Sequence, residues 1–256
     1  MDPDLHPDLP AAGGLPAAPE QAGSTVAGEP FAVLLERLTA HRRPAGAVGE
    51  SGPPTPSMLR RLAPTLGLHT PDLFVIAGVD VPGDLAPVDP KAGRHVPNLV
   101  RHAVALPFRQ RTVLRRYVAS LPPQERAVPF PAPPPHERYP DGPGAVLMGL
   151  ARNRNLGWMA TAKTFFLVTG RCWSAVTYGG VGRGTVPLTA GLLADFCAVL
   201  DVPSDDLAAL TGVALPDVSP AATSSTAGVA ELIWDVRRLT EDRLLAVTEL
   251  AARMRR

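Results

Sequence analysis

The fold is decided by residues 192–216, LLADFCAVLDVPSDDLAALTGVALP, because they repeat residues 58–82, MLRRLAPTLGLHTPDLFVIAGVDVP. The two stretches align without a gap at a constant offset of 134, and seven of the 25 pairs are identical, including Asp72 with Asp206. The match resumes at offset 133 between residues 98–121 and 231–254, with leucine or valine in the same places. A period of this size is too long for a solenoid, so we predict two tandem copies of one domain.

The composition fits two small domains. A chain of 256 residues has room for two domains of about 100 residues each. Hydrophobic residues make up 45% of the chain and aromatic residues only 5%, and there are 30 prolines and 23 glycines. We therefore expect small aliphatic cores separated by Pro- and Gly-rich spacers. Only two of the 25 basic residues are lysine, Lys91 and Lys163, a bias typical of a GC-rich bacterial genome.

The sequence divides into five segments. Residues 1–29 contain Pro, Ala, Gly and acids without periodicity, so we expect a disordered tail. Residues 30–121 hold the first unit and a helical hairpin. The dense prolines of residues 122–143 predict an extended spacer that separates the units. Residues 144–216 hold the second unit, and residues 217–256 a linker and an amphipathic C-terminal hairpin.

Five short helices are predicted in the second unit. Apolar periodicity gives helices over residues 144–157 and 158–168, and a short third helix from Cys172 that runs into a glycine-rich loop. Thr189 is a good N-cap for a fourth helix that ends near Asp201, and a fifth covers residues 205–210. Both units and their hairpins therefore predict an all-α protein.

Each unit is followed by a predicted helical hairpin. Pro107 in the first hairpin aligns with Thr240 in the second, and either residue can begin a helix. The last helix carries one apolar stripe, which makes it amphipathic. This stripe either packs on its own domain or forms a dimer. The stripe consists of Leu244, Val247, Ala251 and Met254.

Residues 144–216 resemble the XRE, or Cro/C1 repressor-like, helix-turn-helix family. The residues that match its turn, its recognition helix and the end of that helix are Trp173, Ser174, Thr177, Tyr178, Val181, Arg183 and Gly184. The first unit departs from the pattern. Residues 32–34 align with residues 145–147 at offset 113, which leaves this unit 21 residues short where helices 2 and 3 should be. The run from His41 has a loop-like composition, so the first unit has lost its reading helix.

The resemblance implies a transcriptional regulator that binds double-stranded DNA. Helix 3, residues 172–179, would enter the major groove with Ser174 and Thr177 near base edges. Five cations would lie on phosphates: Arg152, Arg154, Lys163, Arg171 and Arg183. One small reading surface gives limited affinity, so we expect a homodimer on two half-sites.

The distribution of charge favours nucleic acid more than the net charge of +1 does. Residues 144–188 contain no acid, whereas the next 29 residues contain five aspartates and no base. This predicts one positive and one negative face. A second acid-free run, residues 91–124, could follow phosphates or meet that negative face.

The alternative is a protein-interaction module that retains the repressor-like scaffold and binds an acidic protein partner. Gly179 and Gly180 favour it because they offer no side chain to a base. The shortened first unit favours it too.

Other function classes have weak signals. The loop GGVGRGT from Gly179 has Thr185 where a phosphate-binding loop needs lysine. The six histidines show no metal-ligand spacing, so we expect no enzyme, cofactor or metal site. No apolar run is long enough to span a bilayer, and the N-terminus is acidic rather than signal-like. With only two cysteines, this predicts a cytoplasmic protein, associated with the nucleoid when bound to DNA.

Overall fold

The computed structural model describes residues 31–42, 54–215 and 226–255, and over these residues it is helical with no strand. The predicted all-α class is confirmed. Residues 1–29, for which we expected disorder, lie outside the described residues. Within the described ranges, no helix combines the length and apolar character that a membrane crossing would require.

The α-helices follow the order that the repeat predicts. The first unit contains α1 (Phe31–Arg42), α2 (Pro56–Thr65), α3 (Thr70–Ile76), α4 (Val96–Val104) and α5 (Phe108–Ser120). The second unit contains α6 (Pro143–Asn153), α7 (Trp158–Thr169), α8 (Ala175–Arg183), α9 (Ala190–Leu200), α10 (Ser204–Thr211), α11 (Val229–Val236) and α12 (Glu241–Met254). The hairpin helices α5 and α12 begin directly after Pro107 and Thr240, as the alignment predicts.

Residues that are identical between the copies occupy equivalent places. Gly78 and Gly212 end α3 and α10 at φ of 66° and 70°, a conformation that favours glycine. Asp72 and Asp206 are both buried, although each carries a carboxylate. Leu59 of α2 and Leu73 of α3 are buried like their counterparts Leu193 and Leu207 in α9 and α10. The repeated stretch therefore records a repeated packing arrangement.

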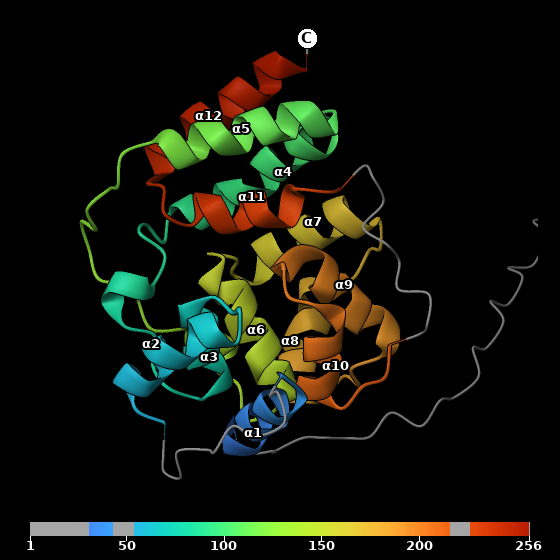
Figure 1. Cartoon of the computed structure of the whole chain (residues 1–256). Helices are drawn as coiled ribbons and strands as arrows, with labels where there is room; N and C mark the ends of the chain where they lie inside the picture. The colour runs from blue at the N-terminus through green and yellow to red at the C-terminus, as the bar shows by residue number, and fades with distance from the viewer. Residues whose placement is uncertain (1–30, 43–53, 216–225, 256) are drawn as a thin grey trace, which may run out of the picture.

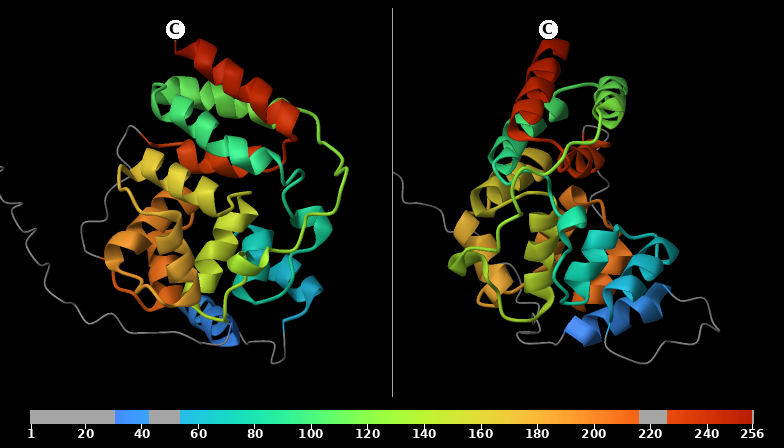
Figure 2. Two further views of the ribbon diagram at one scale, coloured as in Figure 1. Left: turned by 180° about the vertical axis from the view of Figure 1, so that it is seen from behind. Right: turned by 90° about the vertical axis from the view of Figure 1, so that its left-hand side faces the viewer.

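The two copies are interlocked rather than separate (Figures 1 and 2). Helix α1 packs on α10 of the second unit, and α6 packs on α3 of the first. The hairpins cross in the same way, because α4 packs on α12 and α5 packs on α11. The first helix of each copy thus packs on the helix that ends the repeated stretch of the other, α10 or α3.

The packing corrects the alignment of the first helices by one residue. At offset 113, Val33 would match Val146, but Val33 is 39% exposed and Val146 is fully buried. At offset 112 the buried residues of α1, Leu34, Leu35 and Leu38, match the buried residues of α6, Val146, Leu147 and Leu150. The helix continues through His41 to Arg42, where we expected a loop. The rest of that predicted loop, residues 43–53, is outside the described residues.

The proline-rich segment does not hold the copies apart as predicted. Helices of the two units pack directly on each other, α4 on α7 and α3 on α6. The segment instead runs over the surface, and Arg126 fastens it by donating to the carbonyl oxygens of Gly83 and Ala86 at 2.6 and 2.7 Å. Packing of the units buries more apolar area than an extended spacer would.

The apolar stripe of α12 is used inside the chain. Leu244, Val247 and Ala251 are buried, and α12 packs mainly on α4 of the first unit. The stripe therefore packs on the hairpin of the first unit. Neither of the two alternatives, packing on its own domain or dimer formation, describes this contact.

Candidate nucleic-acid interface

Helices α7 and α8 are joined by a short turn with a cap at each end. Gly170 ends α7 at φ 73° and donates its N–H to Phe166 O at 2.8 Å. Ser174 begins α8, and its Oγ accepts the N–H of Thr177 at 3.1 Å. Such caps satisfy backbone groups that a helix end leaves free. They set where α7 ends and where α8 begins, and the two helices pack on each other.

The glycines that predicted a loop after the third helix lie inside α8. A Cβ on Gly179 would sit 2.1 Å from the Trp158 ring, and one on Gly182 would sit 2.5 Å from the Tyr139 ring. Only glycine permits this close approach, and the packing outweighs its poor helix propensity. The helix begins at Ala175, later than the predicted Cys172, because Ser174 is its cap.

The aromatic rings therefore cover the second half of α8, and its first turn stays open. Val176 in this turn is 66% exposed. Beneath the helix, Phe165, Tyr178 and Phe196 meet edge to face, with both other rings 4.9 Å from Phe165. The Tyr178 hydroxyl is buried without a hydrogen-bond partner in the described structure, and burial raises its pKa. A rigid aromatic core thus supports an exposed helix end.

Asp195 organises the turn, and the sequence prediction missed its role. One carboxylate oxygen lies 3.1 Å from Arg171 Nη1, and the other accepts the Trp173 indole N–H at 3.1 Å. Burial raises the pKa of Asp195, and both partners oppose that shift. A signal was present in the sequence, because Asp195 is the one acid within the apolar run of α9.

Three predicted site residues lie in the turn before α8 or in its first turn. Arg171 lies in the turn and also donates to Gly191 O at 2.8 Å. Ser174 caps the helix, and its hydroxyl lies 3.0 Å from that of Thr177. The two hydroxyls that we expected near base edges therefore bind each other in the free protein.

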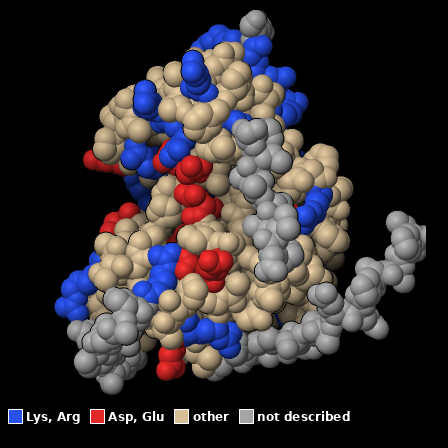
Figure 3. All heavy atoms as spheres, turned by 45° about the vertical axis from the view of Figure 1, so that its right-hand side comes forward, with Lys and Arg blue, Asp and Glu red and all other residues tan. Residues whose placement is uncertain are grey.

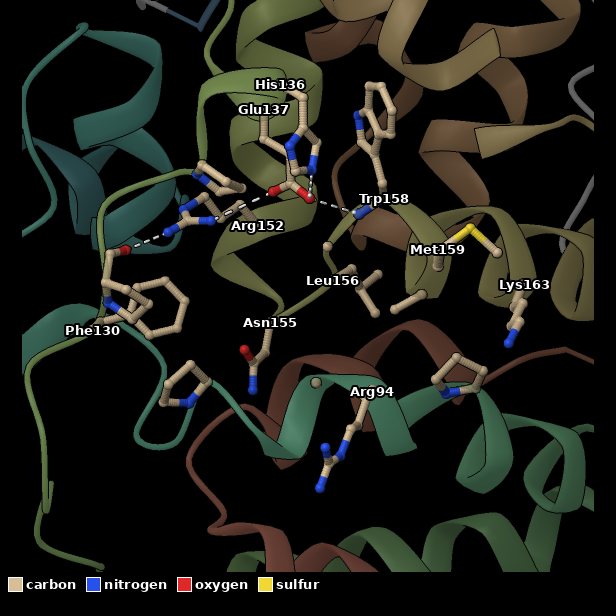
Figure 4. Close-up of a pocket in the computed structure, with 17 residues that line it drawn as sticks. Arg94, Phe130, His136, Glu137, Arg152, Asn155, Leu156, Trp158, Met159 and Lys163 are labelled. Atoms are coloured by element: carbon tan, nitrogen blue, oxygen red, sulfur yellow. Dashed lines mark hydrogen bonds and ion pairs between the residues drawn. The ribbon is translucent and has the colours of Figure 1, made fainter. Parts of the chain in front are cut away.

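At the start of α7, a carboxylate faces Arg152, one of the cations that we expected to lie on phosphates (Figure 4). Glu137 Oε1 accepts the backbone N–H of Trp158 at 3.0 Å, and its Oε2 lies 3.6 Å from Arg152 Nη1. Arg152 also donates to the carbonyl of Pro131. Its guanidinium is thus engaged by the proline-rich segment, so a phosphate at Arg152 would have to compete with Glu137.

Two other predicted cations remain available. Arg183 lies over the Trp158 ring, with its Cζ 5.4 Å from the centroid. Lys163 is exposed on the middle of α7. Across the described ranges, neither side chain has a carboxylate within ion-pair distance. Lys163 and Arg183 can therefore meet an outside anion.

Arg154 is not a surface cation, and its predicted phosphate contact is wrong. Its side chain is completely buried and pairs with Asp72 of the first unit, Nη2 to Oδ2, at 3.0 Å. It lies after the end of α6 and turns inward between the copies. Counting charges along the sequence could not reveal this, because the partner lies 82 residues away.

The predicted negative face is neutralised in part. Asp195 pairs with Arg171, and Asp206 pairs with Arg42 of α1. Asp217 lies outside the described residues. Of the second acid-free run, Arg94 and Arg115 pair with acids of α12 and α11. Figure 3 shows the resulting surface, with acids along the middle and Lys and Arg gathered over the end formed by α5 and α12.

Comparison of the chain with protein families, curated proteins and solved structures finds no match. In the described part of the chain, no three His, Cys, Asp or Glu side chains are grouped as metal ligands would be.

Proposed function

We propose that the chain binds double-stranded DNA through α7, the turn and the first turn of α8. The observation that carries this proposal is the open start of α8, with Val176 exposed. Arg171 lies in the turn before it, and Arg183 lies at the other end of the helix. Residues 144–188 contain no acid of their own. In helix-turn-helix proteins the first residues of the second helix contact base edges, and this is the part of α8 that remains open.

In this proposal the chain is a transcriptional regulator with two repressor-like copies, of which only the second reads DNA. Among the described residues, the first copy has α1, α2 and α3 where the second has five helices. The first copy acts as a scaffold, because α3 packs on α6 and α1 packs on α10. The regulator would work in the cytoplasm and on the nucleoid.

Base contacts fall mainly to Val176 and Thr177. An exposed valine can pack on a thymine methyl group, and a threonine hydroxyl can bond to several base edges. Ser174 has a capping role already, so its contribution to affinity is through helix position. The proposed interface therefore favours A·T pairs beneath the start of α8.

Phosphate contacts fall to Lys163, Arg171 and Arg183. Three contacts predict that log K falls against log salt with a slope of about −2.7, whereas the five cations of the sequence hypothesis predict about −4.5. A second copy would double the number of contacts. Since the α12 stripe is covered, a homodimer would form through another surface, and light scattering with and without duplex would measure it.

Two matched substitutions test the interface. Val176→Asp places an acid on the open turn of α8, and Val113→Asp places one on α5, where Val113 is 56% exposed. Both side chains face solvent, so neither change should unfold the protein. We expect Val176→Asp to weaken binding to a random 20-base-pair duplex at least tenfold in fluorescence anisotropy, and Val113→Asp to change it less than twofold. Equal affinities for both variants would refute the proposal.

A second candidate function is supported by the outer face of α5. Phe108, Val113 and Tyr117 are 55%, 56% and 41% exposed there, beside the exposed Arg109 and Arg116. An apolar and basic face suits an acidic protein partner. If Val113→Asp abolished a cellular function and Val176→Asp did not, the protein-interaction reading would replace DNA binding.

A further inference from the structure

A cavity of about 500 Å³ lies at the seam between the two copies. One wall is formed by residues 93–97 of the first unit, and the other by the α6–α7 connection and the first turns of α7 (Figure 4). The proline-rich segment closes one side with Phe130, Pro131 and Pro134. Sites for small ligands commonly have volumes of this order and lie between packed units.

The walls of the cavity are mainly apolar. Phe130, Leu156 and Met159 face it from three different segments of chain, together with several proline rings. Met159 is 61% exposed, although it is a large apolar side chain. Exposed apolar groups that converge on one hollow gain free energy when an apolar ligand covers them.

The charges at the cavity leave one positive charge unbalanced. Arg152 faces Glu137 at 3.6 Å, and Arg94 binds Glu241 of α12. Lys163 also lines the cavity, and among the residues that the structure describes it has no carboxylate partner. A ligand with one negative group at Lys163 would neutralise the site.

We propose that this cavity binds a small amphipathic monoanion, a compound with a ring or branched apolar body and one carboxylate or sulfonate. The apolar body would lie against Phe130, Leu156 and Met159. The anionic group would lie at the open edge of the cavity, beside the ammonium group of Lys163. A neutral compound of the same shape would gain only the apolar part of this binding.

The site is placed to act on α7. Leu156 forms part of the cavity wall, and α7 begins two residues later at Trp158. A bound ligand would fix this connection against residues 93–97 of the first unit. Its effect on DNA affinity rests on the proposed function, whereas binding of the ligand does not.

The test uses the full chain labelled with ¹⁵N and two probes that share one ring system, naphthalene-1-sulfonate and neutral 1-naphthalenemethanol. Titration followed by amide chemical shifts should place both probes at residues 93–97, 130–137 and 155–163. The sulfonate should bind roughly three- to fivefold more tightly, the factor that one partly exposed ion pair contributes.

Three variants separate the contributions. Lys163→Gln should remove the preference for the sulfonate and leave the alcohol unchanged, and Lys163→Arg should retain the preference. Met159→Ser should weaken both probes alike. Arg109→Gln, on the distant α5, should change neither affinity.

The proposal is overturned if neither probe shifts these amides, if the shifts map to α5, or if both probes bind equally well to the unaltered chain. Adding the sulfonate to the anisotropy assay with duplex DNA is a separate measurement. Ligand binding with no effect on DNA would contradict only the coupling, and loss of DNA binding in Val176→Asp leaves the ligand result intact.

Discussion

Arg154 and Asp72 form a bidentate ion pair that is enclosed at the joint between the two copies. The distances are 3.1 Å from Nη1 to Oδ1 and 3.0 Å from Nη2 to Oδ2, and both side chains are essentially inaccessible to solvent. Arg42 and Asp206 form the equivalent pair, with Nε 2.6 Å from Oδ1. Each pair joins the end of the first helix of one copy, α6 or α1, to α3 or α10 of the other. The duplication thus preserved a reciprocal bond between the copies.

Replacing Arg154 with methionine should lower the free energy of unfolding by about 3–5 kcal/mol, because it leaves the Asp72 carboxylate buried and unpaired. The double variant Arg154→Met/Asp72→Leu should recover much of the loss, since two apolar groups need no partner. Urea denaturation followed by tryptophan fluorescence gives both values.

The equivalent change Arg42→Met serves as a control. Arg42→Met should lower the free energy of unfolding by less than Arg154→Met does, because the Arg42 side chain is 20% exposed and water can replace part of the interaction. Folded Arg154→Met should bind duplex as the unaltered chain does. An intact stability combined with lost DNA binding would restore Arg154 as a phosphate contact.

The interlocked arrangement shows what the sequence could and could not predict. Apolar periodicity and capping residues such as Thr189 are local, and they placed the helices and the restarts at Pro107 and Thr240 closely. Internal similarity revealed that helices repeat. It carried no information on whether α1 covers its own copy or the other, because either choice buries the same leucines.

The candidate site was predictable to the same local extent. The turn, Ser174 and Thr177 could be placed from the residue pattern. The inward turn of Arg154 and the engagement of Arg152 by Glu137 depend on contacts between distant segments, so a count of charges overestimated the free cations. The glycines of α8 were misjudged because propensity describes an isolated helix, and here neighbouring rings require glycine.

Gly179→Ala should destabilise the protein by about 1–3 kcal/mol. The added methyl group would meet the Trp158 ring at 2.1 Å, and overpacking of this kind outweighs the gain in helix propensity of roughly 1 kcal/mol. The ring cannot easily move away, because its Nε1–H donates to Tyr139 Oη at 2.6 Å. Thermal unfolding measures the effect.

Gly83→Ala is the matched control, since nothing lies within 4 Å of its added Cβ and its φ is not positive. It should be nearly neutral. In the double variant Gly179→Ala/Trp158→Leu, the loss of free energy of unfolding should be smaller than the sum of the losses in the two single variants. Strict additivity would show that the ring contact does not limit residue 179.

Tyr178→Phe should leave stability unchanged or raise it by up to about 1 kcal/mol. The hydroxyl is buried without a partner in the described structure, and an unsatisfied polar group costs desolvation free energy that phenylalanine avoids. The ring contacts with Phe165 and Phe196 remain. A loss of more than 1 kcal/mol in urea denaturation would mean that the hydroxyl binds a group such as an internal water.

Glu137→Gln should raise the affinity for random duplex severalfold and steepen its salt dependence by about one phosphate contact, if α7 approaches the DNA backbone. The carboxylate that competes for Arg152 becomes a neutral amide. Its oxygen can still accept the Trp158 N–H, but the NH2 group in the place of Oε2 cannot accept from Arg152. Glu249→Gln, on an exposed position of α12, is the control with the same change in net charge. Equal gains from both variants would indicate a general charge effect rather than competition at α7.

Acidification should weaken the joint between the copies through His69. Its ring stacks on Trp234 at 3.6 Å, and burial lowers its pKa, assisted by Arg154 and Arg237 and opposed by Asp72. Because the folded pKa lies below the unfolded value near 6.5, the unfolded chain binds more protons in this range. The contribution of neutral His69 to the free energy of unfolding is complete above pH 6.5. It declines as the pH falls toward the pKa of His69 in the folded protein.

The decline should stay below about 1 kcal/mol between pH 8 and 6, since the ring is only half-buried and solvent screens the charges. His69→Phe keeps the stacked ring and removes the titration, so its free energy of unfolding should depend less on pH while matching the unaltered chain at pH 8. His102, whose pKa is also lowered by burial and by Arg101, should account for part of the remaining slope. An unchanged slope in His69→Phe would show that protonation of His69 does not strain the joint.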